Sequence, residues 1–294
     1  MNQTATAHAA KPTGTSSLDD YINRAHHLVP APAVLPQLLP LLNQPDVNTG
    51  RVVELISYSQ TVTANVLRIC NSAYYSRGTP IDSLAMAVSR IGFRQIYEIV
   101  VSVISAATLA RPQKGYGVEG NEMWCHSVTS AIAAQIIARE AQLDEQVVFT
   151  AAILHDVGKI VLSVALEDRK EQVQKEMRNN LSPLELELKL LGVNHAEVGG
   201  RLLEKWKLPE HLCQPVRFHH NPAGANGHGK LAACLYLGNF VAYFMGNGFG
   251  QHALDLKGRD AALKLLDLSS DRLPQFMAST QEQFKKVKHM YNLN

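Results

Sequence analysis

The stretch Leu154-His155-Asp156-Val157-Gly158-Lys159 places a histidine beside an aspartate within a run of apolar residues that has helical spacing. An imidazole and a carboxylate together are ligand types that suit iron, manganese or zinc. Alone, the pair is weak support for a metal site, because a His-Asp dipeptide also occurs at an ordinary capped helix end. The residues around it decide between these two interpretations.

Upstream of this pair, a helix predicted over 122–141 carries His126 near its middle and Glu122 one turn earlier. Residues four apart share a helix face, so these two side chains project together. By itself such a pair is more typical of a hydrogen-bonded surface contact. The same face continues with small residues that would let another helix approach closely: Thr129, Ser130 and Ala133.

Downstream, His195 opens a helix predicted over 196–206, and His219 and His220 end a helix predicted over 209–218. Adjacent helical residues diverge by roughly 100°, since a turn takes 3.6 residues. The His-His pair therefore suits a site with more than one metal, or one metal and a supporting histidine. Each histidine alone has a plainer explanation, but their order along successive helices favours a metal centre.

Elsewhere the pattern is helical, and nothing alternates with period two over a useful length. The sequence predicts an all-α fold in which an N-terminal helical lobe packs on a second helical lobe, with a linker over 111–120. The predicted parts are a disordered tail over 1–17, the first lobe over 18–110, the second over 111–250 and C-terminal helices over 251–294. The other predicted helices cover 35–43, 52–58, 63–71, 84–91, 93–110, 145–165, 167–179, 182–191, 230–245, 260–266 and 273–291.

Composition excludes several classes of protein. The 294 residues are 46% hydrophobic and 18% charged with a net charge of +2, too weakly basic to indicate direct nucleic-acid binding. No apolar run is expected to reach the roughly 18 residues of a membrane span, and the N-terminus does not resemble a secretory signal. Four scattered cysteines without a CxxC pair indicate reduced thiols and a cytoplasmic protein: Cys70, Cys125, Cys213 and Cys234.

Several further segments follow the order typical of one family. They are Leu67-Arg-Ile-Cys-Asn-Ser-Ala-Tyr-Tyr75, Ile81 to Ala87 followed by Ile91-Gly92, Trp124-Cys-His-Ser127, Asn194-His-Ala-Glu-Val-Gly199, Trp206-Lys-Leu-Pro-Glu210 and Phe218-His-His-Asn-Pro222. With the His-Asp pair, they make the chain resemble the HDOD family over about residues 28–222. That family is a branch of the HD superfamily of metal-dependent phosphohydrolases and is related to the HD-GYP phosphodiesterases. We interpret the turn after Leu67 as structural, with Asn71 capping a helix end.

The resemblance implies a set of metal ligands for a divalent transition metal, iron first and otherwise manganese or zinc, as one or two ions. The implied ligands are His126, His155, Asp156, His195, His219 and His220. Glu122 matches an additional carboxylate of some relatives that hold a third metal. Lys159 matches a lysine near substrate phosphate, so Asp156 and Lys159 are the expected catalytic residues if the protein is an enzyme.

Two departures from the superfamily pattern leave the function open. Asn239 takes the expected place of the aspartate that closes the site, and the loop after His220 lacks the Gly-Tyr-Pro motif of cyclic-di-GMP phosphodiesterases. These departures favour a signalling module that binds regulatory proteins, with no membrane partner. The retained ligands support the alternative, a metal-dependent phosphohydrolase acting on a nucleotide or another phosphoester.

Overall fold

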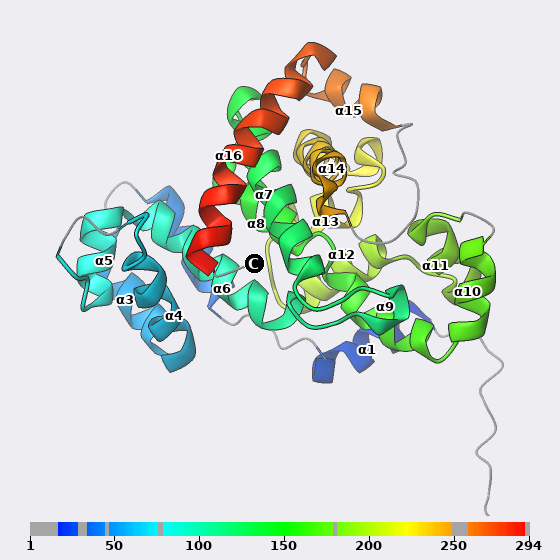
Figure 1. Ribbon diagram of the computed structural model, residues 1–294, viewed down its shortest axis with the longest axis horizontal. Coiled ribbons are helices and arrows are strands. Elements are labelled where there is room, and N and C mark those ends of the chain that lie inside the picture. The colour runs from blue at the N-terminus through cyan, green and yellow to red at the C-terminus, as the bar shows by residue number, and fades with distance from the viewer. Residues whose placement is uncertain are drawn as a thin grey trace, which may run out of the picture.

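The computed structural model describes residues 17–28, 34–44, 47–75, 79–178, 181–248 and 258–291. Within these ranges the chain is built of helices, and the β-bridge between Gln113 and Val118 is isolated. The prediction of an all-α fold is confirmed (Figure 1). The tail predicted over 1–17 lies outside the described residues except for Ser17.

The N-terminal helices form one end of the molecule, where α3, α4 and α5 lie together in Figure 1. The elements are α1 (Leu18–Leu28), α2 (Leu35–Leu38), the 3-10 turn η1 (Leu39–Asn43), α3 (Thr49–Ser57), α4 (Gln60–Cys70), α5 (Leu84–Ile91) and α6 (Phe93–Leu109). Asn71 ends α4 as predicted: its side-chain amide donates to Leu67 O (2.9 Å) and Ile81 O (2.7 Å). This turn holds the start of the α5 segment against α4.

The remaining helices build the larger part of the molecule. They are η2 (Lys114–Tyr116), α7 (Glu122–Glu140), α8 (Glu145–Leu154), α9 (Val157–Glu167), α10 (Lys170–Arg178), α11 (Pro183–Leu191), α12 (His195–Lys205), α13 (Glu210–Arg217), η3 (Pro222–Gly224), α14 (Gly229–Ala242) with a π-helical turn η4 (Tyr243–Asn247), α15 (Arg259–Leu265), η6 (Ser270–Arg272) and α16 (Leu273–Tyr291). One prediction was wrong in detail. The helix expected over 145–165 is broken at His155 and Asp156, which form a turn between α8 and α9.

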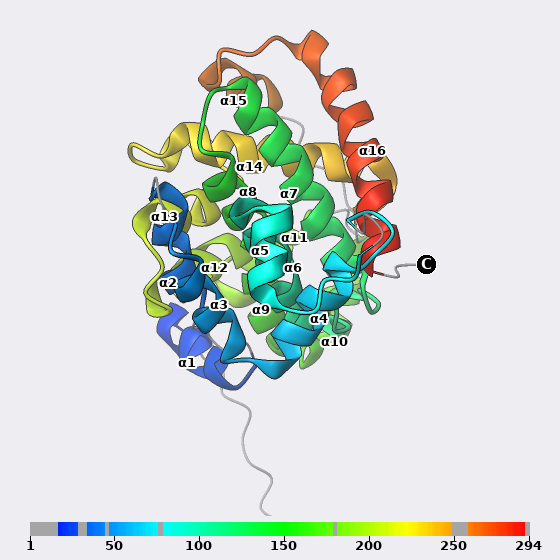
Figure 2. The ribbon, with the colours of Figure 1, turned by 90° about the vertical axis from the view of Figure 1, so that its left-hand side faces the viewer.

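Helix α7 is the central element, because other helices cover it on several sides. Figure 2 shows α14 crossing it and α16 running beside it. Gly238 of α14 lies against Ser130 and Ala134 of α7, so closely that a Cβ at this glycine would collide with both. The small residues on α7 thus allow the close helix approach that the sequence predicted.

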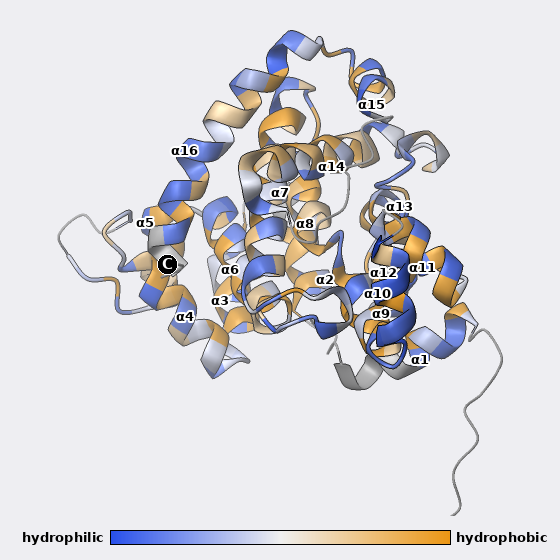
Figure 3. Ribbon diagram, turned by 45° about the vertical axis from the view of Figure 1, so that its right-hand side comes forward, coloured by the Kyte–Doolittle hydropathy of each residue, from blue (hydrophilic) through white to orange (hydrophobic). Residues whose placement is uncertain are grey.

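One continuous set of buried apolar side chains joins the described parts of the chain. Helix α6 contacts α4 and α5 as well as α7 and α8. The 111–120 segment, expected as a linker, packs against α9, where Gly115 N donates to the buried Ser163 Oγ (3.1 Å). Figure 3 shows apolar residues mostly on the inner faces of the helices. The domain boundaries stay predictions.

Glu145–Glu167, the stretch formed by α8 and α9, is long and apolar enough to cross a membrane, but 94% of its apolar window is buried inside the protein. The expectation that no apolar stretch would reach this length missed it, because His155, Asp156 and Lys159 interrupt the run. Burial explains its composition, since a helix covered on all sides is apolar all round.

Candidate metal centre

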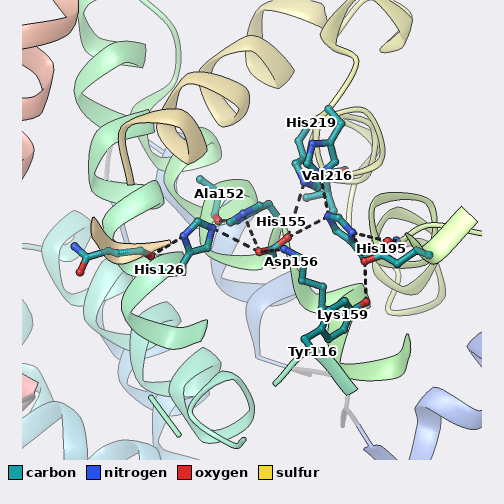
Figure 4. Close-up of polar contacts among 12 residues, drawn as sticks. Tyr116, His126, Ala152, His155, Asp156, Lys159, His195, Val216 and His219 are labelled. Atoms are coloured by element: carbon teal, nitrogen blue, oxygen red, sulfur yellow. Dashed lines mark hydrogen bonds and ion pairs between the residues drawn. The ribbon is translucent and has the colours of Figure 1, made fainter. Parts of the chain in front are cut away.

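Six of the expected site residues converge where α7, α9, α12 and α13 meet (Figure 4). They are His126 from α7, His155 and Asp156 from the turn before α9, His195 from the start of α12, and His219 and His220 from the turn after α13. Each is at most 1% exposed apart from His220, which is half-buried. Polar side chains are rarely buried this completely without a partner or a bound group.

Asp156 lies at the middle of the cluster, and its two carboxylate oxygens face different histidines. Oδ2 is 3.3 Å from His155 Nε2 and 3.6 Å from His126 Nε2. Oδ1 is 3.3 Å from His195 Nε2 and 3.9 Å from His219 Nε2. Four imidazole nitrogens therefore surround one carboxylate.

The second ring nitrogen fixes the orientation of these histidines. In three of them Nδ1 lies within hydrogen-bond distance of a backbone carbonyl oxygen: His126 with Asn247 (3.0 Å), His155 with Ala152 (2.6 Å) and His219 with Val216 (2.7 Å). A carbonyl oxygen only accepts, so Nδ1 carries the proton and Nε2 keeps its lone pair. This is the tautomer and orientation of a metal-ligating histidine whose other nitrogen is held by a supporting group.

Glu187 on α11 orients His195 in the same way, and the sequence analysis did not identify it. Its carboxylate accepts from His195 Nδ1 (2.7 and 2.9 Å), from His195 N (2.7 Å) and from the Tyr116 hydroxyl (2.8 Å). The carboxylate is fully buried. One signal could have found it: Glu187 lies four residues before the buried Leu191, so the acid falls on the apolar face of its helix.

The possible ligand atoms fall into two groups of three, each within 4.8 Å of one another. The groups are His126, His155 and Asp156, and His195, His219 and His220. His220 Nε2 lies 2.9 Å from His195 Nε2, and the His155 and His219 rings meet edge-on with centroids 5.0 Å apart. The neighbouring groups offer nitrogen and oxygen donors and no sulfur, a set that fits iron, manganese or zinc.

Burial favours the neutral form of three of the imidazoles. It lowers the pKa of His126 to about 3 and the pKa values of His219 and His220 well below their ordinary value. These rings are neutral at pH 7, as metal ligation requires.

Asp156 and Lys159 form a buried ion pair, with Nζ 2.7 Å from Oδ2. Burial alone would raise the pKa of Asp156, but its contacts with His155 and Lys159 hold that pKa well below the ordinary value. Burial would also lower the pKa of Lys159, yet Asp156 outweighs it and raises that pKa. Lys159 is 4% exposed, so its ammonium is held by the carboxylate inside the protein.

Two expected residues are placed outside both ligand groups. Glu122 is exposed in the first turn of α7, where its carboxylate accepts from Glu119 N (2.9 Å). Asn239 is buried on α14, and its Oδ1 has no hydrogen-bond partner in the described part of the chain. The chain just beyond α14 contacts His126 instead: the Tyr243 ring meets it edge-on with centroids 5.1 Å apart, and Asn247 supplies the carbonyl oxygen.

Local sequence explains why the donors meet. Asn194 caps α12 through a capping box with Glu197, which places His195 in the first turn. Gly158 of α9 packs directly on the start of α12, where a Cβ would overlap the carbonyl oxygen of His195. Only glycine at this position lets α9 and α12 bring Asp156 and His195 together.

These features define an all-helical protein with a buried His/Asp centre suited to a transition metal. The chain belongs to the HDOD domain family, whose sequence profile matches residues 28–222. An uncharacterized protein of Treponema pallidum is 25% identical over 221 residues, covering 73% of this chain. The match spans only 42% of that relative's length.

Solved structures share the fold. An HDOD domain protein of unknown function from Geobacter sulfurreducens superposes with a TM-score of 0.67 and 23% identity, covering 90% of this chain and 99% of that one. A "putative phosphohydrolase" from Shewanella amazonensis gives 0.67 and 21%, covering 92% and 94%. A "putative signal transduction protein" from Marinobacter aquaeolei gives 0.69 and 22%, covering 93% and 65%.

Proposed function

We propose that this protein is a signalling output module that holds a divalent transition metal in its His/Asp centre and acts mainly by binding regulatory proteins. One observation carries the metal proposal: the Nε2 atoms of four histidines surround Asp156 while a carbonyl or carboxylate fixes each opposite nitrogen. Iron is the first expectation from the family, with manganese and zinc compatible with the same donors.

The charges of the centre support one tightly held ion more strongly than two. Asp156 and Glu187 are acidic, Lys159 is basic, and burial keeps the imidazoles of His126, His219 and His220 neutral. The group of His126, His155 and Asp156 contains an anionic ligand, whereas the group of His195, His219 and His220 has none of its own and only faces the same carboxylate through Asp156 Oδ1. Asn239 adds no negative charge, so we expect the all-histidine group to bind a second ion more weakly.

Burial supports a regulatory role over turnover. Five of the six possible ligands are at most 1% exposed, and the lysine expected near phosphate is paired with Asp156 inside the protein. A substrate needs a path to the metal, and the ammonium would have to leave its carboxylate to reach a phosphate. In this proposal the metal stabilises the helical fold, and the regulatory proteins bind to the folded helices.

The alternative is a metal-dependent phosphohydrolase, and the two adjacent ligand groups favour it. Pairs of metal ions supply Lewis-acid chemistry that suits phosphoester hydrolysis. In that case Asp156 would hold both ions and Lys159 would steady the phosphate, and the substrate would be a nucleotide or another phosphoester.

A turnover screen separates the two functions. Wild-type protein loaded with iron, manganese or zinc would be incubated with cyclic-di-GMP and a panel of phosphoesters, beside His155→Ala. We expect no cyclic-di-GMP hydrolysis approaching 1 s⁻¹, within the usual range of enzyme turnover. Wild-type turnover of any substrate, lost in a His155→Ala variant that stays folded by circular dichroism, would establish the enzyme instead.

The proposal also includes a cytoplasmic location, without membrane or direct nucleic-acid binding. The four cysteines are free thiols, as a reducing compartment favours. The charge balance of the chain supports protein partners over nucleic acid.

A further inference from the structure

A second cavity lies away from the His/Asp centre, between the N-terminal helices and the helices that carry the centre. Its volume is about 660 Å³, a size typical of small-molecule sites. Helices α4 and α6 contribute to one side, and α7, α8 and α16 contribute to the other. None of the six possible metal ligands lines it.

The polar part of the lining contains an unsatisfied buried acceptor. Glu98 accepts hydrogen bonds from the side-chain amides of Gln95, Gln135 and Gln146, each 2.8 Å long. Because the nitrogen of Gln146 must donate to Glu98, its Oε1 is fixed as the remaining acceptor. That oxygen is buried and has no hydrogen-bond partner among the residues that the structure describes, and Gln146 is only 5% exposed. A ligand that offers an N–H group would satisfy it.

Aromatic rings line the same cavity. Tyr74 and Tyr75 meet edge-on with ring centroids 4.7 Å apart, and Tyr74 is 53% exposed. Phe93 and Phe149 also belong to the lining. Rings of this kind stack on flat heteroaromatic groups, which prefer such a surface to water.

Three cations complete the lining: Arg94, Arg139 and Lys286. Arg94 is exposed and has no acidic partner in the described part of the chain. Arg139 pairs with Glu145, and Lys286 with Glu282, at the surface, where such pairs are weak and exchange readily. The acidic residues of the lining are Glu98 and Glu145, so its three cationic side chains outnumber its acidic ones.

We propose that this cavity binds a nucleotide. The base would donate an N–H group to Gln146 Oε1 beside the aromatic rings, and the phosphate would face Arg94, Arg139 and Lys286. Helix α8 carries Gln146 in its first turn, at this cavity, and ends beside His155, about 14 Å from Gln146 at 1.5 Å per residue. A ligand held here would therefore contact the same helix that positions the His/Asp turn.

Calorimetric titration of the full chain, treated with EDTA to remove metal, tests the proposal with GMP and AMP as probes. Guanosine and ribose 5-phosphate separate the base from the phosphate. We expect at least one nucleotide to bind saturably, and each fragment to bind about tenfold more weakly or less. If neither nucleotide binds up to about 1 mM, or if guanosine binds as tightly as GMP, the proposal is wrong.

Variants locate the bound nucleotide. Arg94→Gln and Gln146→Met should each weaken binding about tenfold, since each removes one polar contact. Arg111→Gln, an exposed arginine outside the cavity, is the matched control and should bind like the wild type. Arg94 is exposed, so its replacement leaves the fold intact even if Gln146→Met does not. Binding that survives Arg94→Gln and disappears in His155→Ala would place the nucleotide at the His/Asp centre and overturn the assignment.

Discussion

At the scale of single residues, the orientation of the imidazole rings decides what the centre can bind. Three rings are held by backbone carbonyl oxygens, which substitution cannot remove directly, but His195 is held by the Glu187 side chain. Supporting groups of this kind orient a ligand and raise its basicity. Replacing Glu187 therefore changes the support of His195 without removing any of the six possible ligands.

Glu187→Gln keeps the shape of the side chain but removes its charge. We expect the affinity for the metal to fall by about 10- to 100-fold, because the amide supports His195 less well. Competition with a fluorescent chelator measures this affinity. Glu171→Gln, an exposed glutamate on α10, is the control and should bind metal like the wild type. Equal affinities for the two variants would mean that Glu187 does not support a metal ligand.

Acid should destabilise the metal-free protein through its buried histidines. The pKa of His126 is lowered from 6.5 to about 3, so below pH 6.5 the unfolded chain takes up a proton that the folded chain refuses. The contribution of neutral His126 to the free energy of unfolding is therefore fully present above pH 6.5 and is lost as the pH falls toward 3. Between pH 7 and pH 5 the loss is about 2 kcal/mol for this residue.

Urea unfolding at pH 7 and pH 5, with EDTA present, measures this loss. His126→Gln cannot titrate, so its loss between the two pH values should be smaller than that of the wild type by about 2 kcal/mol. An identical pH dependence in both proteins would show that His126 is not buried as a neutral ring.

At the scale of helices, the centre depends on how closely α9 can approach α12. Gly158 makes this contact. In the sequence it is one glycine among several, so its packing role is not evident there. The helices themselves could be predicted from apolar spacing and caps. The break at His155 and Asp156 could not, because apolar residues with helical spacing lie on both sides of this polar pair and the turn is fixed by contacts with other helices.

Gly158→Ala should disturb the centre without removing a ligand. The added Cβ overlaps the His195 carbonyl oxygen, so α9 or α12 must shift, at a cost of about 1–3 kcal/mol. Thermal unfolding and metal content both report the change. Gly120→Ala is the control, since its nearest neighbour atom would be at an ordinary 3.5 Å. A Gly158→Ala variant that matches Gly120→Ala in stability and metal content would contradict the close packing.

At the scale of the whole molecule, the N-terminal helices and the helices that carry the His/Asp centre share one core through α6. The order of the six possible ligand residues could be read from the sequence because residue type and family pattern mark them. Tyr243 and the Asn247 carbonyl oxygen could not, since only the packing of the chain after α14 brings them to the His126 ring. For Glu187 the sequence offers one signal, an acid on the apolar face of its helix. Glu122 lies outside both ligand groups, because sharing a helix face with His126 does not bring its carboxylate to the cluster.

Val66→Asp tests whether this core is shared. Val66 is fully buried on α4, so a carboxylate there should cost several kcal/mol and lower the melting temperature of the whole protein in one transition. Val164→Asp, on a residue that is 47% exposed, should change it little. Two separate transitions in Val66→Asp, with the part that carries the His/Asp centre melting like the wild type, would show independent lobes.

The metal content of the protein, made without a histidine tag, tests the central claim most directly. Elemental analysis should find about one ion of iron, manganese or zinc per chain, and at most two, because the donors are imidazoles and one carboxylate. His155→Ala and Asp156→Ala should lose this metal, while His211→Ala, outside both ligand groups, should retain it. Wild-type protein that is purified free of metal, and that binds none of the three when they are added back, would contradict the account.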